Sequence, residues 1–143
     1  MKNVKLSHLL TFFSDYELIG NAEIELSGIS LNSKEIVQDN VFFAIKGFNS
    51  DGHLYIPDAI SLGATLIVCQ TLPSEVSNRV SYLIVKDPRD FLAIFSKKFF
   101  GDSDEKLTKV GITGTNGKTS TTFFIRQLAN RVGLKCGLIG TIE

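Results

Sequence analysis

The chain has 143 residues, of which 43% are hydrophobic and 21% are charged, and its 15 basic residues balance its 15 acidic residues. This composition is typical of a globular protein and excludes an intrinsically disordered chain. The balanced charge excludes a broad field that attracts nucleic acid or an anionic membrane, so neither is expected as a partner. No apolar run reaches the ~18 residues of a membrane-spanning helix, and the N-terminus lacks the apolar segment of a signal peptide. We therefore expect a cytoplasmic protein with no membrane insertion.

The first hundred residues alternate between patterns typical of helices and of strands. Apolar residues at helical spacing indicate amphipathic helices, whereas apolar runs bounded by glycine and polar residues indicate strands. Asp87 followed by Pro88 is typical of a helix N-terminus, because a carboxylate caps free amides and proline fits the first turn. In chain order, the expected elements are a helix over 5–14, strands over 24–26, 29–31 and 41–45, a helix from Pro57 to Gly63, strands over 64–69 and 82–85, and a helix from Asp87 to Gly101.

The last part of the chain carries a second run of alternating patterns. After a polar connector at residues 102–106, the sequence predicts a strand over 107–112, a glycine-rich turn, a helix over 118–132 and a strand over 134–139. The order strand, helix, strand is that of a βαβ crossover, whose first loop lies at the carboxyl end of a strand.

The whole pattern predicts an α/β protein with a largely parallel sheet, because strands alternate with helices. Residues 107–143 are too few to bury a sheet between two layers of helices. We therefore expect a complete first domain over residues 1–106, followed by the truncated opening of a second domain. The two cysteines, Cys69 and Cys136, each lie in a strand-like run, which favours buried, reduced thiols over a disulfide or a metal site.

The turn before the last predicted helix has the residues of a phosphate-binding loop. Gly114 and Gly117 let the backbone approach phosphate oxygens, and Lys118 can reach the β- and γ-phosphates of a nucleotide. The helix N-terminus favours an anion, and the Thr119 hydroxyl can bind Mg²⁺. The common pattern G-x-x-x-x-G-K-[ST] is not strictly met, because its first glycine falls on Ile112. A plain glycine-rich turn with an incidental lysine is the alternative, which the context of strand, turn and helix disfavours.

The segment Thr113–Thr119 closely resembles the ATP loop of the Mur ligases, the family that builds the peptide stem of bacterial peptidoglycan. Upstream segments resemble further motifs in the family's order, so the resemblance covers nearly the whole chain. These segments are Leu31–Lys34 for an Asp-Ser-Arg motif, Asp39–Ala44 for a strand, Gly47–His53 for a Gly-x₃-Asp-Gly-His loop, and Tyr55–Ile60 with Gly63–Ala64, which continue the match. Asn32 and Lys34 depart from the family's Asp and Arg, so the salt bridge of that pair is absent or altered.

The resemblance implies an N-terminal substrate domain of the Mur ligase type, followed by the first βαβ unit of a P-loop ATPase-type central domain. It implies ATP and Mg²⁺ as cofactors, with Lys118 as the catalytic residue on the phosphates and Thr119 near the metal. The ATP-binding residues are then Gly114, Thr115, Asn116, Gly117, Lys118, Thr119 and Ser120. The residues that match family positions around the uridine end of the substrate are Leu31, Ser33, Phe48, Asn49 and Ser50. From the residues alone, turn chemistry explains Ser33 and Asn49 equally well, and His53 is expected to stabilise its loop.

The resemblance also implies a reaction. ATP phosphorylates the terminal carboxylate of a UDP-linked substrate, an amine attacks the acyl phosphate, and ADP and phosphate leave. Asn116 and the ending Gly137–Ile142 most resemble the family member that adds the third stem residue. Its substrates are a UDP-N-acetylmuramoyl dipeptide and a free amino acid, either lysine or diaminopimelate. The runner-up is the member that adds D-alanyl-D-alanine, which usually carries Ser in place of Asn116.

Three functions are weighed from these residues. The first is the amide ligase, although the family's later motifs have no counterpart in the chain, so the chain alone is expected to be inactive. The second is a nucleoside-phosphate kinase or another P-loop NTPase, which gives no role to the α/β pattern before the loop. The third is a non-catalytic module that binds the UDP-linked substrate.

Overall fold

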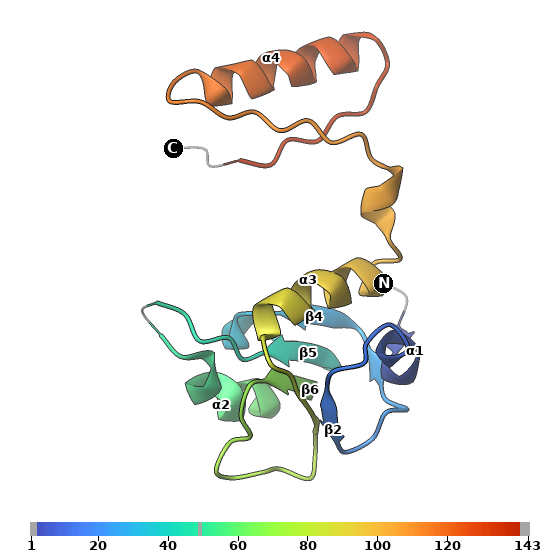
Figure 1. The fold of residues 1–143 in the computed structure, drawn as a ribbon, viewed down its shortest axis with the longest axis vertical. Coiled ribbons are helices and arrows are strands. Elements are labelled where there is room, and N and C mark those ends of the chain that lie inside the picture. Colours follow the sequence, from blue (N-terminus) through green and yellow to red (C-terminus); the bar gives the residue numbers. More distant parts are fainter. Residues whose placement is uncertain (1–2, 49, 141–143) are drawn as a thin grey trace. The chain divides into compact units, whose positions relative to one another are not determined.

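The structure is a computed structural model that describes residues 3–48 and 50–140. The chain divides into two compact units, Met1–Lys106 and Leu107–Glu143. The first unit holds a sheet with helices, and the second holds one long helix, α4, with the segments on either side of it (Figure 1). Among the described residues, no helix has the length and apolar character that crossing a bilayer requires.

The first unit is built on a five-stranded sheet with the strand order β2-β7-β6-β5-β4. The strands from β4 to β7 are parallel, and β2 pairs with β7 in the antiparallel direction. A separate antiparallel ladder joins β1 to β3. The strands are β1 Val4–Lys5, β2 Glu17–Ile19, β3 Glu25–Leu26, β4 Gly28–Ser30, β5 Asn40–Phe43, β6 Ala64–Cys69 and β7 Ser81–Ile84. This mainly parallel sheet confirms the predicted fold class.

Helices cover both faces of the sheet, which explains why its central strands are apolar on both sides. Val41 and Phe43 of β5 belong to the buried cluster that includes α1 and α3, whereas Phe42 belongs to the cluster that includes α2. Figure 1 shows α3 and α2 on opposite sides of the strands. The helices of this unit are α1 Leu6–Leu10, α2 Ile56–Ser61 and α3 Pro88–Phe99, and the 3₁₀ turns are η1 Ser33–Glu35, η2 Gly52–Tyr55 and η3 Ser103–Lys106.

Helix α3 begins and ends as its sequence predicts. The Asp87 carboxylate accepts hydrogen bonds from two backbone amides of the first turn, and Pro88 occupies the first helical position. Every fourth residue from Phe91 to Phe99 is a buried phenylalanine, so one face of the helix is aromatic and packs on the sheet. Gly101 has a φ of 69°, the left-handed conformation in which many helices end.

The sequence patterns overestimate one helix and miss two short strands. Helix α1 ends at Leu10, because the chain turns there and carries Phe13 onto Phe91, with the two ring centroids 4.2 Å apart. Phe13 therefore continues the helical spacing of the apolar residues without being helical. The sequence does not predict β1 and β2, because strands of 2 and 3 residues are too short to show a periodic pattern.

The second unit contains helix α4, Lys118–Arg131, but the two predicted flanking strands are wrong. Residues 107–112 and 134–139 carry no strand assignment, so the expected βαβ crossover is not formed. A parallel pair needs neighbouring strands and a covering layer, and α4 buries none of its residues. The loss of this strand also leaves Cys136 only half-buried, whereas Cys69 is fully buried as expected.

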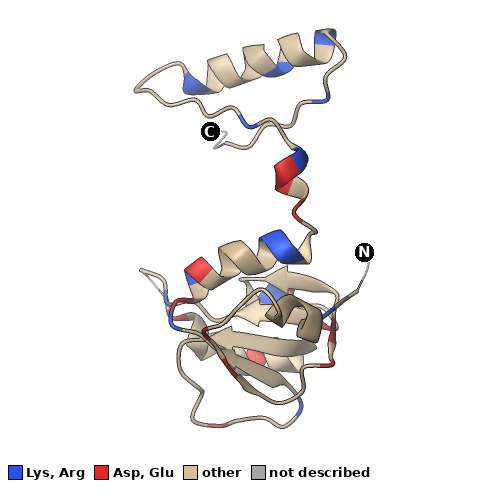
Figure 2. Ribbon diagram, turned by 45° about the vertical axis from the view of Figure 1, so that its right-hand side comes forward, with Lys and Arg blue, Asp and Glu red and all other residues tan. Residues whose placement is uncertain are grey.

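The connector that follows α3 is held by ion pairs. Basic residues close α3 and acidic residues lie in and just before η3 (Figure 2). The ammonium of Lys97 lies 2.8 Å from a carboxylate oxygen of Glu105, and the ammonium of Lys98 lies 3.0 Å from Asp102. The first pair is exposed and the second is part-buried, and together they tie the start of the connector to α3.

Candidate functional site

The glycine-rich turn before α4 has the backbone geometry of an anion-binding loop. Gly117 precedes the first helical residue with a φ of 76°, and Gly114 has a φ of 152°. Glycine adopts such angles readily and other residues rarely do. The Gly117 carbonyl accepts a hydrogen bond from the Thr121 amide at 2.9 Å, which starts the helix. The other amides of the first turn have no acceptor within the helix, so they are available to an anion at this end.

Lys118 brings a cation to the same turn. Its ammonium donates hydrogen bonds to the carbonyl oxygens of Gly114 at 2.6 Å and Thr115 at 3.4 Å, so the side chain folds back over the loop. Every residue from Gly114 to Ser120 is exposed. The loop therefore presents amides, one cation and the N-terminal end of a 14-residue helix to solvent, a combination that can bind and neutralise phosphate.

Thr119 is the residue that the sequence assigns to Mg²⁺. Its hydroxyl can supply one oxygen ligand, and residues 3–48 and 50–140 contain no group of three or more His, Cys, Asp or Glu side chains that could hold a metal. Mg²⁺ keeps several waters and binds through one or two protein oxygens together with substrate phosphates. The Thr119 hydroxyl therefore fits the role of one ligand of Mg²⁺, with a nucleotide as the source of further oxygen ligands.

The residues predicted to hold a uridine group follow two neighbouring parallel strands. Leu31 and Ser33 follow β4, and Phe48 and Ser50 follow β5, so both segments leave the sheet at its carboxyl edge, where open α/β sheets bind ligands. Leu31 and Ser50 are exposed and Phe48 is fully exposed, whereas Ser33 is buried. Asn49 lies outside the described residues. We call the segments 31–33 and 46–52, without residue 49, the substrate edge.

Asn32 has a structural role at the position where the Asp-Ser-Arg pattern has its acid. Its side-chain oxygen accepts a hydrogen bond from the Lys34 amide at 3.1 Å, and its amide group donates to the Glu35 carboxylate at 3.0 Å. These bonds cap η1 at its N-terminal end. The turn that carries Ser33 is therefore maintained without an Asp–Arg salt bridge.

A chain of hydrogen bonds that the sequence does not predict connects this edge to β6 and β7. The Asp51 carboxylate oxygen Oδ1 accepts from the backbone amide of His53 at 3.0 Å and lies 2.7 Å from its Nδ1. His53 Nε2 accepts from the Gln70 amide at 3.3 Å, and the Gln70 side chain donates to the Lys86 carbonyl at 2.9 Å. Because Nε2 accepts a hydrogen bond, Nδ1 is the ring nitrogen that donates a hydrogen bond to the Asp51 carboxylate. The bonds from His53, first from its backbone amide and then from its ring, lower the pKa of Asp51 from the ordinary value of 3.8.

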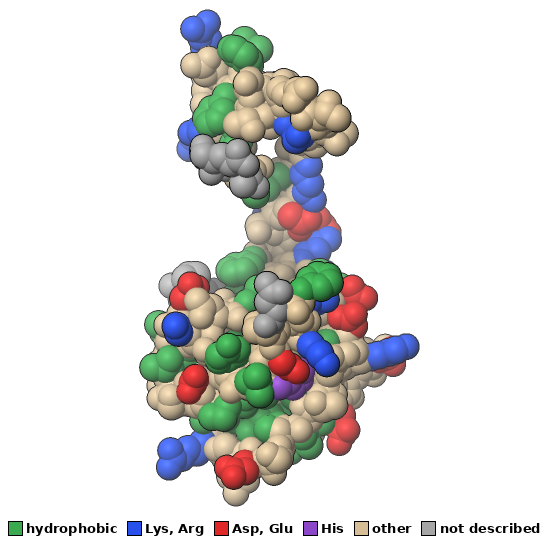
Figure 3. Space-filling model, turned by 90° about the vertical axis from the view of Figure 1, so that its left-hand side faces the viewer, with side chains coloured by type: hydrophobic (Ala, Val, Ile, Leu, Met, Phe, Trp, Pro, Cys, Tyr) green, Lys and Arg blue, Asp and Glu red, His purple; other side chains and the backbone are tan. Residues whose placement is uncertain are grey.

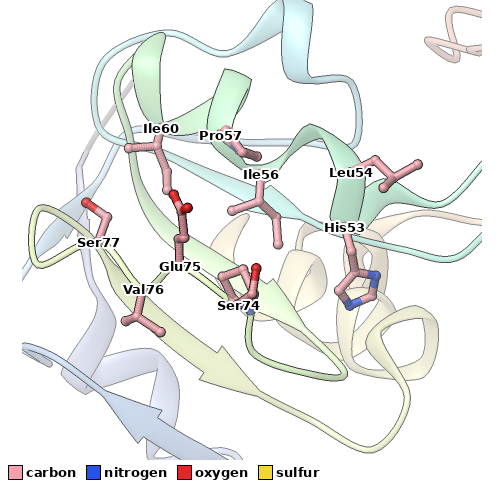
Figure 4. A pocket seen from close by; sticks show the side chains of 10 residues that line it. His53, Leu54, Ile56, Pro57, Ile60, Ser74, Glu75, Val76 and Ser77 are labelled. Atoms are coloured by element: carbon pink, nitrogen blue, oxygen red, sulfur yellow. The ribbon is translucent and has the colours of Figure 1, made fainter.

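A pocket of about 620 Å³ lies between α2 and the segment that connects β6 to β7 (Figure 4). On the face of the unit shown in Figure 3, hydrophobic side chains gather around a histidine. The pocket is lined by His53, Leu54, Ile56, Pro57, Ile60, Pro73, Ser74, Glu75, Val76 and Ser77. Among the described residues, Leu31, Ser33, Phe48 and Ser50 do not line it, so this pocket is separate from the described part of the substrate edge.

The parallel sheet and the loop before α4 define an α/β protein that carries a P-loop-like turn. Residues 25–100 match the family model described as "Mur ligase family, catalytic domain". The chain is 37% identical over 139 residues to the UDP-N-acetylmuramoyl-L-alanyl-D-glutamate--2,6-diaminopimelate ligase of Bacteroides fragilis. The chain belongs to the Mur ligase family.

Solved structures share the fold. MurF from Acinetobacter baumannii has a TM-score of 0.72 at 18% identity, over 92% of this chain and 28% of that chain. MurF ligase from Thermotoga maritima in complex with ADP has a TM-score of 0.57 at 30% identity, over 72% of this chain and 23% of that chain. The match to the Bacteroides relative covers 97% of this chain and 29% of the relative, so the chain spans less than a third of the lengths that it matches.

Proposed function

We propose that the chain supplies the substrate-binding and ATP-binding parts of an ATP-dependent, ADP-forming amide ligase of peptidoglycan synthesis. The ligase adds the third amino acid to UDP-N-acetylmuramoyl-L-alanyl-D-glutamate. The observation that carries the proposal is the Lys118 ammonium over a glycine-rich loop at the start of α4. The 37% identity to a relative whose name gives this substrate supports the same assignment.

In this proposal, each of the two units binds a different substrate. Residues 107–143 hold the nucleotide, with the loop amides and Lys118 on the phosphates and Thr119 on Mg²⁺. Residues 1–106 hold the uridine end of the second substrate. Phosphoryl transfer depends on charge neutralisation and alignment more than on covalent help from the protein, which suits a loop that offers amides and one cation. The ADP named in the Thermotoga structure supports the same class of nucleotide for this chain.

The chemistry takes two steps. A carboxylate oxygen of the D-glutamyl residue attacks the γ-phosphorus of ATP, which forms an acyl phosphate and releases ADP. The amine of the incoming amino acid attacks the acyl carbon, loses a proton and displaces inorganic phosphate, which leaves an amide. Lys118 neutralises charge on the phosphoryl oxygens during the first step. Mg²⁺, when bound, supplies further neutralisation.

The substrate edge suits a uridine group. Phe48 and Leu31 expose apolar surface, and aromatic side chains stack on bases. Ser50 and Asn49 can form hydrogen bonds with the polar edge of uracil. Ser33 is buried, so it contributes to substrate binding through the backbone of its turn. Its hydroxyl can reach the substrate only when the turn opens on binding.

The name of the relative supports a choice of the third amino acid, and the substrates support a compartment. Its name gives 2,6-diaminopimelate as the amino acid, which favours diaminopimelate over lysine for a polypeptide that contains this chain. A reaction that consumes ATP and a UDP-linked precursor belongs in the cytoplasm. An assay that supplies each amino acid in turn separates the two candidates by product mass.

Titration calorimetry tests the proposal on the 143-residue chain. We expect binding of UDP-N-acetylmuramoyl-L-alanyl-D-glutamate and weaker binding of UDP alone. A chain that binds ATP but ignores the UDP-linked dipeptide overturns the ligase proposal and favours an unrelated P-loop NTPase. Stronger binding of the UDP-linked tripeptide than of the dipeptide favours the member of the family that adds D-alanyl-D-alanine.

A further inference from the structure

The loop of residues 46–52 closes on itself at the end of β5. Lys46 and Asp51 form an isolated antiparallel bridge, and the Gly47 amide donates to the Ser50 carbonyl at 2.8 Å. The Gly52 amide donates to the Ile45 carbonyl at 3.0 Å. A Cβ atom on Gly52 would lie 2.6 Å from the Ile45 nitrogen, so only glycine permits this approach. The backbone of the loop is therefore paired at its base, while Phe48 points into solvent.

One side of this base is anchored to the sheet. Asp51 is bound twice by His53, whose ring accepts from Gln70 at the end of β6, and Gln70 in turn reaches Lys86 after β7. The bond between Gln70 and His53 joins the loop region to backbone at the end of β6, and the bond from Gln70 to Lys86 joins that end to backbone after β7. The Asp51 side of the loop is thus fixed through elements that are themselves buried in the sheet.

The other side is anchored to α3. The guanidinium of Arg89 donates from Nη2 to the Lys46 carbonyl at 2.8 Å, across 43 residues of sequence. The backbone of Arg89 is itself fixed, because its amide donates to the Asp87 cap at 2.8 Å. Phe91, two residues further, is buried in the core. A charged donor on the anchored first turn of α3 therefore holds the Lys46 side of the loop.

We infer that Arg89 is a positioning residue for the substrate edge. The inference rests on the proposed function, because it assumes that Phe48 and Ser50 meet the uridine end of the substrate. In this role Arg89 acts through the Lys46 carbonyl and not through direct contact with the substrate. A binding loop that is ordered in advance loses less conformational entropy when its ligand arrives. Arg89 therefore raises affinity for the UDP-linked substrate without contributing to the nucleotide loop.

The test compares Arg89→Ala with Arg89→Lys and with the control Arg79→Ala. Arg79 is also exposed and lies in the segment between β6 and β7, and none of the described contacts of the substrate edge involves it. We expect Arg89→Ala to weaken binding of UDP-N-acetylmuramoyl-L-alanyl-D-glutamate about tenfold in titration calorimetry, the change that corresponds to about 1.4 kcal/mol. Arg89→Lys keeps a cationic donor and should recover part of the affinity, and Arg79→Ala should match the wild type.

A second measurement separates positioning from stability. Amide hydrogen exchange at Gly47 and Gly52 should become faster in Arg89→Ala, while the melting temperature stays close to that of the wild type, because Arg89 is exposed. Equal affinity of Arg89→Ala and wild type overturns this inference and leaves the proposed function standing. A wild-type chain that does not bind the UDP-linked dipeptide overturns the proposed function, and the role of Arg89 falls with it.

Discussion

The ammonium of Lys118 donates a hydrogen bond to the carbonyl oxygen of Gly114, 2.6 Å away and four residues earlier in the chain. This contact places a positive charge over the glycine-rich turn at the end of α4 where the helix dipole is also positive. The two effects act at the same place, and we expect an anion that binds there to replace the Gly114 carbonyl as a partner of the lysine.

Replacement of Lys118 by alanine removes this cation and leaves the backbone amides in place. We expect Lys118→Ala to weaken binding of a fluorescent ATP analogue by more than about tenfold, which corresponds to about 1.4 kcal/mol, and to leave affinity for the UDP-linked dipeptide unchanged. Lys135→Ala is the matched control, because Lys135 is an exposed lysine of the same unit that lies outside the loop. Unchanged affinity of Lys118→Ala for the analogue contradicts the role given to Lys118.

Replacement of Asp51 by asparagine keeps an oxygen that can accept from the His53 amide but removes the charge. His53 lowers the pKa of the Asp51 carboxyl from 3.8, so the folded state binds a proton at this site less readily than the unfolded state. The extra stability of the wild type over Asp51→Asn should be fully present above pH 3.8 and should be lost as the pH falls through the lowered pKa. Urea denaturation of both proteins across this range measures the difference, and a gap that grows on acidification contradicts the assignment.

Phe95 lies at the centre of the aromatic face of α3. Its ring is fully buried and lies 5.6 Å from the ring of Phe43 on β5. Phe95→Ala should lower the free energy of unfolding by about 3–5 kcal/mol, because the cavity cannot be refilled from solvent. The neighbouring residue Ile94 is 50% exposed, and Ile94→Ala should cost less than about 1 kcal/mol. Equal losses in chemical denaturation show that α3 packs through a different face.

The two cysteines should differ in reactivity. Burial raises the pKa of the Cys69 thiol to about 11, so at pH 8 the reactive thiolate is scarce as well as inaccessible. Cys136 is half-buried and lies in the segment after α4. With a disulfide reagent at pH 8 we expect one thiol to react rapidly and Cys69 to react only after unfolding. Rapid reaction of Cys69 in the native chain shows that the β6 end of the sheet is open.

Local sequence signals predict much of the first unit. The Asp87-Pro88 cap, the four-residue spacing of phenylalanines in α3 and the continuous apolar run of β6 each report a local cause, and each element forms where it is expected. The patterns fail where the cause is distant. Phe13 imitates a helical position because it packs on Phe91, a contact between residues far apart in the sequence.

The substrate edge was predictable only in outline. The order of the motifs places Leu31 and Phe48 after successive strands, and parallel pairing of β4 with β5 then brings both segments to one edge. The bonds that hold this edge come from Gln70 and Arg89, which belong to no motif of the loop. Neither residue type has a spacing signal for such a contact, so only the folded chain reveals it.

In the second unit, the element that depends only on local hydrogen bonds forms, and the elements that depend on distant partners do not. Residues 118–131 form α4 although the helix buries none of its residues, because the backbone hydrogen bonds of a helix lie within one segment, even though a helix of this length gains most of its stability from packing. The segments 107–112 and 134–139 are apolar enough to be strands, but a strand requires a neighbour for its backbone hydrogen bonds. The composition of these segments therefore shows that they could form strands, but it does not show that they pair with each other or with another strand.

Amide chemical-shift mapping on the isotope-labelled chain asks most directly whether this polypeptide holds two separate ligand sites. Addition of UDP-N-acetylmuramoyl-L-alanyl-D-glutamate should move the signals of Leu31, Ser33 and Ser50. Addition of ATP with Mg²⁺ should move the signals of the loop Gly114–Ser120 and leave the first set in place. Shifts confined to the pocket beside α2, or no shifts with either ligand, would contradict the proposed ligase function.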